Sequence, residues 1–172
     1  MGQFRAPPPT LRSLTTGRTA VAQALFTGAT LNLTEADTGK YFALMATSNA
    51  QMVINMPTLT GAMNGITYTF WIMATSTGGY QFDCGVDTDF SIGGLSLGTA
   101  AINQQSNGVF RSCGTGMDRM SIKSGETNGG GGVGSMIRIT AIVGSMGVWG
   151  VDGNVLTTDA TSTGAALFVN TS

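Results

Sequence analysis

From about residue 24 onward, the chain is a succession of short apolar or alternating runs, each ended by residues that favour turns. Apolar spacing of the 3.6-residue type, which would indicate amphipathic helices, is nearly absent. The segments 77–79, 129–132 and 152–153 are rich in glycine and have the chemistry that tight turns require. The sequence therefore predicts an all-β fold, a β-sandwich or jelly roll of about ten short antiparallel strands.

Two of the predicted strands contain informative residues. In 66–74, threonines alternate with apolar residues at first, and the second half is apolar on both faces, as expected beneath a second sheet or a partner. Arg138 is the one charge in 135–143, and we interpret it as an edge-strand gatekeeper or as half of an inter-subunit ion pair. The predicted strands are 24–33, 40–46, 51–56, 66–74, 80–84, 90–92, 108–113, 120–123, 135–143, 148–151 and 166–170. One helical turn is predicted near 34–39, where Thr34 and Asp37 have capping-box spacing.

The first 23 residues differ from the rest of the chain. They contain no acidic residue, and three successive prolines impose an extended, polyproline-like conformation on their part of the segment. We therefore divide the chain into an extended N-terminal arm, 1–23, and a β-sandwich or jelly-roll domain, 24–172. The arginines of the arm are candidates for docking onto acidic neighbours, although charge that only solubilises the arm explains them equally well. The candidate partner-binding residues are Arg5, Pro7, Pro8, Pro9, Arg12 and Arg18.

The charge of the chain is unusually low. Charged residues make up 10% of it, against about 25% in an average soluble domain. Such a chain can cover much of its surface with other subunits, although a soluble monomer kept dispersed by hydroxyls and amides is the alternative. The net charge is −1 and the basic residues are scattered, so we expect no nucleic-acid partner. No apolar run approaches the length of a membrane span, so we expect no membrane partner.

The chain contains no histidine. This removes the usual general base near neutral pH and the commonest zinc ligand. The G-x-S-x-G pattern at 94–98 lacks the strand-to-helix context and the later histidine that a nucleophile elbow needs. The glycine run at 129–134 precedes a predicted strand, whereas a dinucleotide fingerprint follows one. We therefore expect no enzymatic activity, no catalytic residue and no cofactor.

Three aspartates, Asp83, Asp87 and Asp89, lie close together in the sequence. Clustered carboxylates can bind Ca²⁺ weakly, but EF-hand spacing fails here, so we interpret them as turn-capping residues and predict no metal site. Cys84 and Cys113 do not resemble a disulfide framework. The N-terminus has no apolar leader region, so we expect synthesis in a reducing cytoplasm with both thiols reduced.

The two tryptophans have different sequence surroundings. Trp71 lies inside the most apolar predicted strand, so we expect it in the core. Trp149 lies in a glycine-rich segment, 147–153, that has the composition of a turn. We therefore predict Trp149 as a possible surface contact, for example for stacking on a sugar.

Several segments together resemble one known protein module. The first part comprises 33–44 (LTEADTGKYFAL), 54–57 (INMP) and 65–70 (GITYTF), which are similar to the opening of that module. The second comprises 135–140 (SMIRIT) and 147–153 (GVWGVDG), which resemble its closing hairpin. The module that these segments resemble belongs to bacteriophage virion proteins and occurs in capsid decoration proteins, head fibres and tail-associated proteins alike. The resemblance implies a β-sandwich or jelly-roll subunit, commonly a trimer, that clamps neighbouring capsomers, and it carries over no catalytic residue.

Residue chemistry and resemblance together predict a capsid decoration (cement) protein. It would bind the major capsid protein on the capsid surface of the virion, stabilise the shell and associate with itself as a homotrimer. The alternative is a head- or tail-fibre module that binds a receptor or a glycan. A third possibility is the major coat protein of a small jelly-roll capsid, but three arginines make a poor genome-binding arm.

Overall fold

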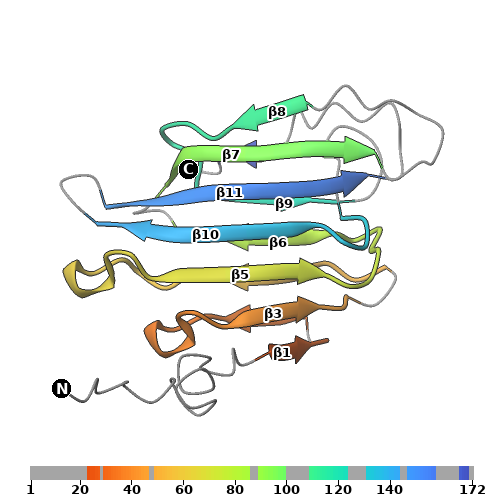
Figure 1. Cartoon of the computed structure of the whole chain (residues 1–172), viewed down its shortest axis with the longest axis horizontal. Helices are drawn as coiled ribbons and strands as arrows, with labels where there is room; N and C mark the ends of the chain where they lie inside the picture. The colour runs from red at the N-terminus through yellow and green to blue at the C-terminus, as the bar shows by residue number, and fades with distance from the viewer. Residues whose placement is uncertain are drawn as a thin grey trace, which may run out of the picture.

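The computed structural model describes residues 23–27, 29–46, 49–85, 89–99, 109–123, 131–143, 147–157 and 167–170. These residues form two β-sheets packed face to face, which confirms the predicted all-β sandwich (Figure 1). Two short 3-10 turns, η1 (Glu35–Asp37) and η2 (Gly61–Met63), complete the regular structure. No helix in the described part of the chain is long and apolar enough to span a bilayer.

The larger sheet has seven strands and the smaller sheet has five. In spatial order, the seven-stranded sheet consists of β1 (Gln23–Phe26), β3 (Tyr41–Leu44), β5 (Thr67–Ile72), β10 (Met136–Ile142), β11 (Val148–Thr157), β7 (Phe90–Thr99) and β8 (Val109–Ser112). The five-stranded sheet consists of β12 (Phe168–Val169), β9 (Arg119–Ile122), β6 (Tyr80–Asp83), β4 (Met52–Asn55) and β2 (Thr30–Asn32).

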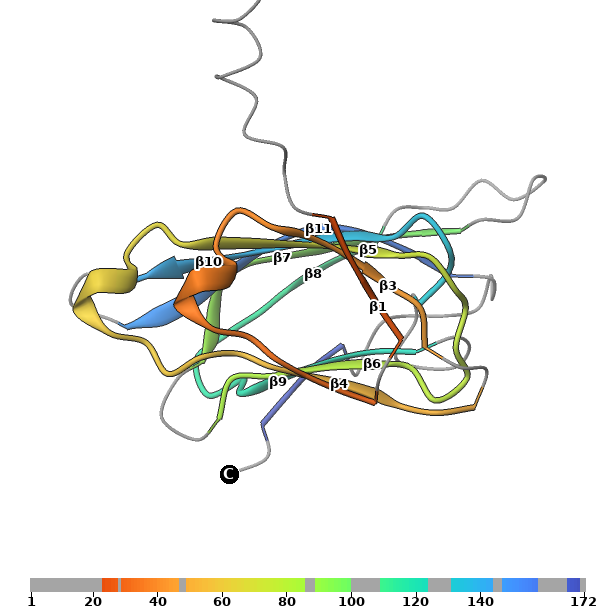
Figure 2. The same cartoon turned by 90° about the horizontal axis from the view of Figure 1, so that it is seen from below.

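The strand directions correct one prediction, because the sheets are mixed and not antiparallel. Five of the ten strand pairings in the described residues are parallel. From β1 to β6 the chain changes sheet after every strand (Figure 2). Each strand therefore runs in the same direction as the previous strand of its own sheet. Short alternating runs are equally compatible with a hairpin and with this path between layers.

The N-terminal half contains an internal repeat that follows this path. The register pairs Tyr41 with Thr69 and Met52 with Tyr80, so equivalent positions in both sheets are 28 residues apart. The segments 45–48 and 73–76 both read Met-Ala-Thr-Ser, and 34–39 and 60–65 share the pattern Thr-x-Ala-x-x-Gly. The turns η1 and η2 lie in the latter pair and sit at the same end of the sandwich (Figures 1 and 2). The two units therefore stack as successive coils.

The core lies between the two sheets and is dominated by aromatic rings. Phe70 of β5 stacks on Phe42 of β3, with ring centroids 5.4 Å apart. Across the layers, Phe70 meets Phe82 of β6 edge to face at 4.9 Å. The hydroxyl of Tyr80 is hydrogen-bonded to the backbone of both Ala46 and Ala74, so it ties the two repeat units together.

Asp37 stabilises the predicted turn at η1. Its carboxylate accepts hydrogen bonds from the backbone N–H of Thr34 at 2.9 Å and from the Thr34 hydroxyl at 2.7 Å, and it forms an ion pair with Lys40. Burial raises the pKa of Asp37, but the hydrogen bonds from Lys40 and Thr34 outweigh it and lower the pKa below the ordinary value of 3.8.

The lowered pKa of Asp37 predicts loss of stability in acid. The contribution of this carboxylate is fully present above pH 3.8 and is lost as the pH falls through the lower pKa of the folded state. The Asp37→Asn variant should lose about 0.5–1 kcal/mol near neutral pH. Urea unfolding from pH 7 to pH 2 should show this difference narrowing in acid. A constant difference across that range would contradict the assignment.

Candidate interaction surface

The outward face of the seven-stranded sheet carries exposed apolar side chains. Six of the seven large hydrophobic side chains exposed in the described residues lie on it, and Val133 in a loop is the seventh. Strand alternation and cross-strand register place Tyr41, Trp71, Ile92 and Phe110 on the same side of the sheet. Met45 and Met73 directly follow β3 and β5 and continue the same alternation. We call this surface the apolar face, and its exposed members are Tyr41, Met45, Trp71, Met73, Ile92 and Phe110.

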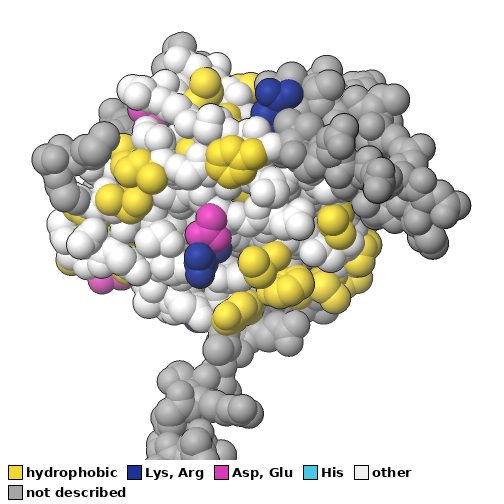
Figure 3. Space-filling view, turned by 45° about the horizontal axis from the view of Figure 1, so that its top comes forward, with side chains coloured by type: hydrophobic (Ala, Val, Ile, Leu, Met, Phe, Trp, Pro, Cys, Tyr) yellow, Lys and Arg dark blue, Asp and Glu magenta, His cyan; other side chains and the backbone are white. Residues whose placement is uncertain are grey.

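One ion pair lies in the middle of the apolar face. Arg138 of β10 and Asp152 of β11 are register partners, and Nε and Nη2 of Arg138 donate to Oδ2 of Asp152 at 2.9 and 2.8 Å. The hydrogen bonds and the charge of Asp152 raise the pKa of Arg138. Figure 3 shows an adjoining basic and acidic side chain, blue and magenta, with yellow hydrophobic side chains on several sides of them. Both side chains are about half exposed, at 55% and 54%, so they remain open to a partner.

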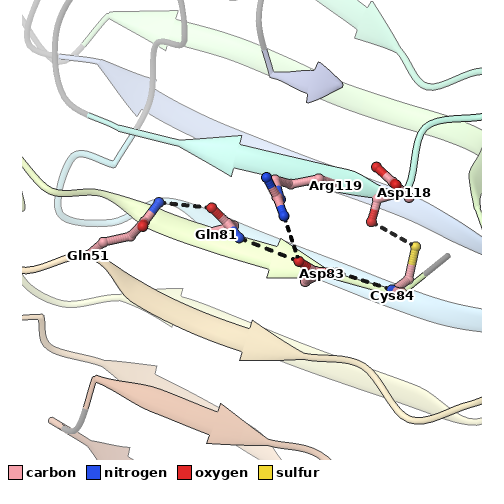
Figure 4. A network of polar contacts seen from close by, with 7 residues as sticks. Gln51, Gln81, Asp83, Cys84, Asp118 and Arg119 are labelled. Carbon is pink, nitrogen blue, oxygen red and sulfur yellow. Dashed lines mark hydrogen bonds and ion pairs between the residues drawn. The ribbon is translucent and has the colours of Figure 1, made fainter. Parts of the chain in front are cut away.

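The outward face of the five-stranded sheet has the opposite character. Arg119 donates to Asp83 at 3.1 Å, and Gln51 donates to Gln81 at 2.9 Å (Figure 4). In the adjoining strands, Asn55 donates to the side chain of Asn32 at 2.7 Å. No large hydrophobic side chain that is exposed in the described residues belongs to a strand of this sheet. The sandwich therefore has one apolar outer face and one polar outer face.

The positions of the two tryptophans, buried or exposed, are the reverse of those predicted. Trp149 is wholly buried, with its ring 6.0 Å from that of Tyr68, so the predicted surface contact at Trp149 is wrong. Trp71, predicted in the core, is 39% exposed. Side chains on a strand point alternately inward and outward. Trp149 occupies an inward position of β11, whereas Trp71 lies between the inward-pointing Phe70 and Ile72 of β5 and therefore points outward.

Several of the remaining candidate residues lie outside the part of the chain that the structure describes. The arm residues Arg5, Pro7, Pro8, Pro9, Arg12 and Arg18 lie outside the described residues, so their role stays a prediction. Asp87 also lies outside them.

The two described aspartates of the cluster have protein partners. Asp83 accepts from the backbone N–H of Gly85 at 3.0 Å as well as from Arg119, and Asp89 accepts from Gly116 at 2.8 Å. Over the described ranges, no group of three or more metal-ligating side chains of the His, Cys, Asp and Glu types comes together.

The structure also places the serine of the G-x-S-x-G pattern and the two cysteines. Ser96, the central residue of the G-x-S-x-G pattern, lies in the middle of strand β7 and not at a strand-to-helix turn. Cys84 and Cys113 are both buried and unbridged, and burial raises the pKa of the Cys113 thiol. A raised pKa keeps a thiol protonated and poorly nucleophilic at neutral pH.

Arg138 corrects a further interpretation. Of its two interpretations, the edge-strand gatekeeper is wrong, because β10 lies in the interior of its sheet, between β5 and β11, whereas the inter-subunit ion pair stays a prediction. The sequence patterns did not indicate Tyr41, Ile92 and Phe110 as surface residues. The alternation in 67–73 contained part of the signal, because Trp71 and Met73 are in phase with Thr67 and Thr69.

Comparison of the chain with protein-family models, with curated proteins and with solved structures found no match. The resemblance to phage virion modules therefore rests on the sequence motifs alone.

Proposed function

We propose that this chain is a capsid decoration protein, which binds the major capsid protein of a bacteriophage shell and stabilises the virion. The observation that carries the proposal is the apolar face, with its exposed aromatic and methionine side chains. Aromatic residues and methionine are enriched where proteins bind other proteins, and contiguous exposed apolar surface is uncommon on monomers. Low overall charge and the virion-like motifs support the same function.

The proposal assigns different tasks to different parts of the chain. The sandwich supplies a rigid body with the apolar face on one side and the polar face on the other. The arm, 1–23, with Arg5, Arg12 and Arg18, binds acidic surface on the shell. Many weak contacts of this kind, repeated over a shell, add up by multivalency.

The alternative is a receptor- or glycan-binding module of a head or tail fibre. Its main candidate, Trp149, is buried and so is removed from this hypothesis. The exposed Trp71 and Tyr41 are the remaining side chains on which a sugar ring could stack. The copy number in purified virions separates the functions: a decoration protein occurs in a fixed ratio to coat protein, whereas a fibre occurs in far fewer copies. Absence of the chain from the particles would overturn both.

The arm is tested in the full-length chain by replacing Arg5, Arg12 and Arg18 together with alanine. If the arm docks by charge, co-sedimentation with particles that lack the protein should require at least about tenfold more of the variant, because each arginine contributes an ion pair to the bound state. Raising the salt concentration should weaken the wild type in the same way. The matched control is Lys123→Ala, which removes a cation after β9. Undiminished binding of the triple variant would refute the role of these arginines.

A further inference from the structure

The arrangement of side chains on the apolar face points to a particular occupant. Along the strand order β3, β5, β10, β11, β7, β8, the outward side chains include Tyr41, Trp71, Arg138, Asp152, Ile92 and Phe110. An aromatic residue therefore lies near each side of the sheet, and an anion and a cation lie side by side in the middle. We infer that the apolar face binds the apolar face of a second copy of this chain, related by a two-fold axis.

The axis of this pairing runs parallel to the strands, between β10 and β11. Rotation about it places β10 of one copy against β11 of the other, so Arg138 faces the partner's Asp152 and Asp152 faces the partner's Arg138. It also places the β3–β5 side, with Tyr41 and Trp71, against the β7–β8 side of the partner, where Phe110 lies. Apolar surface thus meets apolar surface on both sides of the paired charges.

Charge complementarity favours a second copy over an acidic or basic partner. Among the described strand positions that point outward on this face, Arg138 and Asp152 are the charged residues, and their charges cancel. A strongly charged partner would meet one like charge whichever sign it carried. The same face turned by the two-fold rotation presents an opposite charge to each of them. The pair is therefore self-complementary, as an isologous interface requires.

The size of the face agrees with a stable interface. Seven strands at the usual spacing of about 4.8 Å span roughly 30 Å, and seven residues of β10 extend about 24 Å, which gives a projected area of roughly 700 Å². Stable interfaces bury about 800 Å² on each partner. The inference rests on the proposed role of the apolar face as a protein-binding surface and assigns that face to a second copy, so contact with a shell falls to the arm, 1–23. The pairing itself does not require binding to a capsid shell.

Sedimentation of the purified full-length chain, without particles, tests the pairing. At about 100 µM the wild type should sediment as a dimer, because a face of this size with aromatic anchors supports micromolar association. Trp71→Asp should raise the dimer dissociation constant at least about 30-fold, as expected when an aromatic anchor beside the paired charges is replaced by a charge. The matched control is Val53→Asp on the outward side of the five-stranded sheet, which should dimerise like the wild type.

A mixing experiment isolates the contact between copies from the ion pair within one copy. Arg138→Asp gives a face with two acids, and Asp152→Arg gives a face with two bases, so each variant alone should dimerise poorly. Mixed in equal amounts, the two variants should form a heterodimer, because each face now meets opposite charge. Loss of the ion pair within one copy cannot explain a dimer that forms again only when the two variants are mixed. Circular dichroism and thermal unfolding of each variant establish that it is folded.

Several results would overturn the pairing. These are a monomer at about 100 µM, a trimer such as the phage resemblance implies, association that Trp71→Asp leaves unchanged, or a mixture of the two charge variants that stays monomeric. Particle binding is a separate measurement. A chain that pairs in solution but never binds a shell would refute the decoration function and leave the pairing intact.

Discussion

Replacing Phe70 with alanine is expected to lower the free energy of unfolding by about 3–5 kcal/mol. The ring of Phe70 is completely buried on β5, where it stacks on Phe42 in its own sheet and meets Phe82 of the opposite sheet. Its removal takes away the burial of the ring and leaves a cavity between the layers. Because single domains are stable by only about 5–15 kcal/mol, this one change would remove a large share of the total.

Urea unfolding followed by circular dichroism measures the effect of Phe70→Ala. The matched control is Phe110→Ala, which makes the same change on β8 at a side chain that is 60% exposed. At a protein concentration of about 1 µM, where association contributes little, the control should lose less than about 1 kcal/mol. Equal losses in the two variants would show that the contacts of Phe70 between the sheets do not hold the fold together.

Gly93→Ala is expected to destabilise the chain by about 2–6 kcal/mol, since backbone strain and overpacking each contribute about 1–3 kcal/mol. Gly93 has a φ of +92°, in the region that favours glycine. It lies beside Val151 in the parallel pairing of β7 with β11, and a Cβ added at Gly93 would lie 2.0 Å from the carbonyl oxygen of Val151. The new methyl group would therefore separate two long strands.

Gly39→Ala separates the two causes of the Gly93 effect. Gly39 also has a positive φ, +72°, but a Cβ there meets nothing within 4 Å. This control should therefore show backbone strain alone, about 1–2 kcal/mol. Thermal unfolding of both variants gives the comparison. If Gly93→Ala lost no more than Gly39→Ala, the close approach of β7 to β11 would not be a determinant of stability.

The existence of the strands could be predicted from the sequence better than their arrangement. The alternation in 66–74 predicted a strand that the structure places at Thr67–Ile72, and the capping pattern at Thr34 predicted the turn η1. Direction was wrong for half of the pairings because it depends on which sheet the next strand joins. The 28-residue repeat contained that information, but much of its sequence differs between the two units.

The candidate surface was harder to predict than the fold. A run that is apolar on both faces, such as Phe70 to Met73, does not show which of its side chains point outward. Glycines around Trp149 have turn chemistry, yet this residue lies within β11 and faces the core. Arg138 and Asp152 are separated by 14 positions, and register between β10 and β11 brings them together.

The path between layers also sets the order in which the molecule can fold. Pairing β1 with β3 or β3 with β5 closes loops of 18 and 28 positions, respectively, because each passes through the opposite sheet first. The antiparallel pair β10–β11 spans a much shorter connection, between Ile142 and Val148. Loop-closure entropy therefore favours this central hairpin as the earliest nucleus, and the slower coils assemble onto it. Pulse-labelled hydrogen exchange should find its amides protected first, so the ion pair of the apolar face would form before most of the face exists.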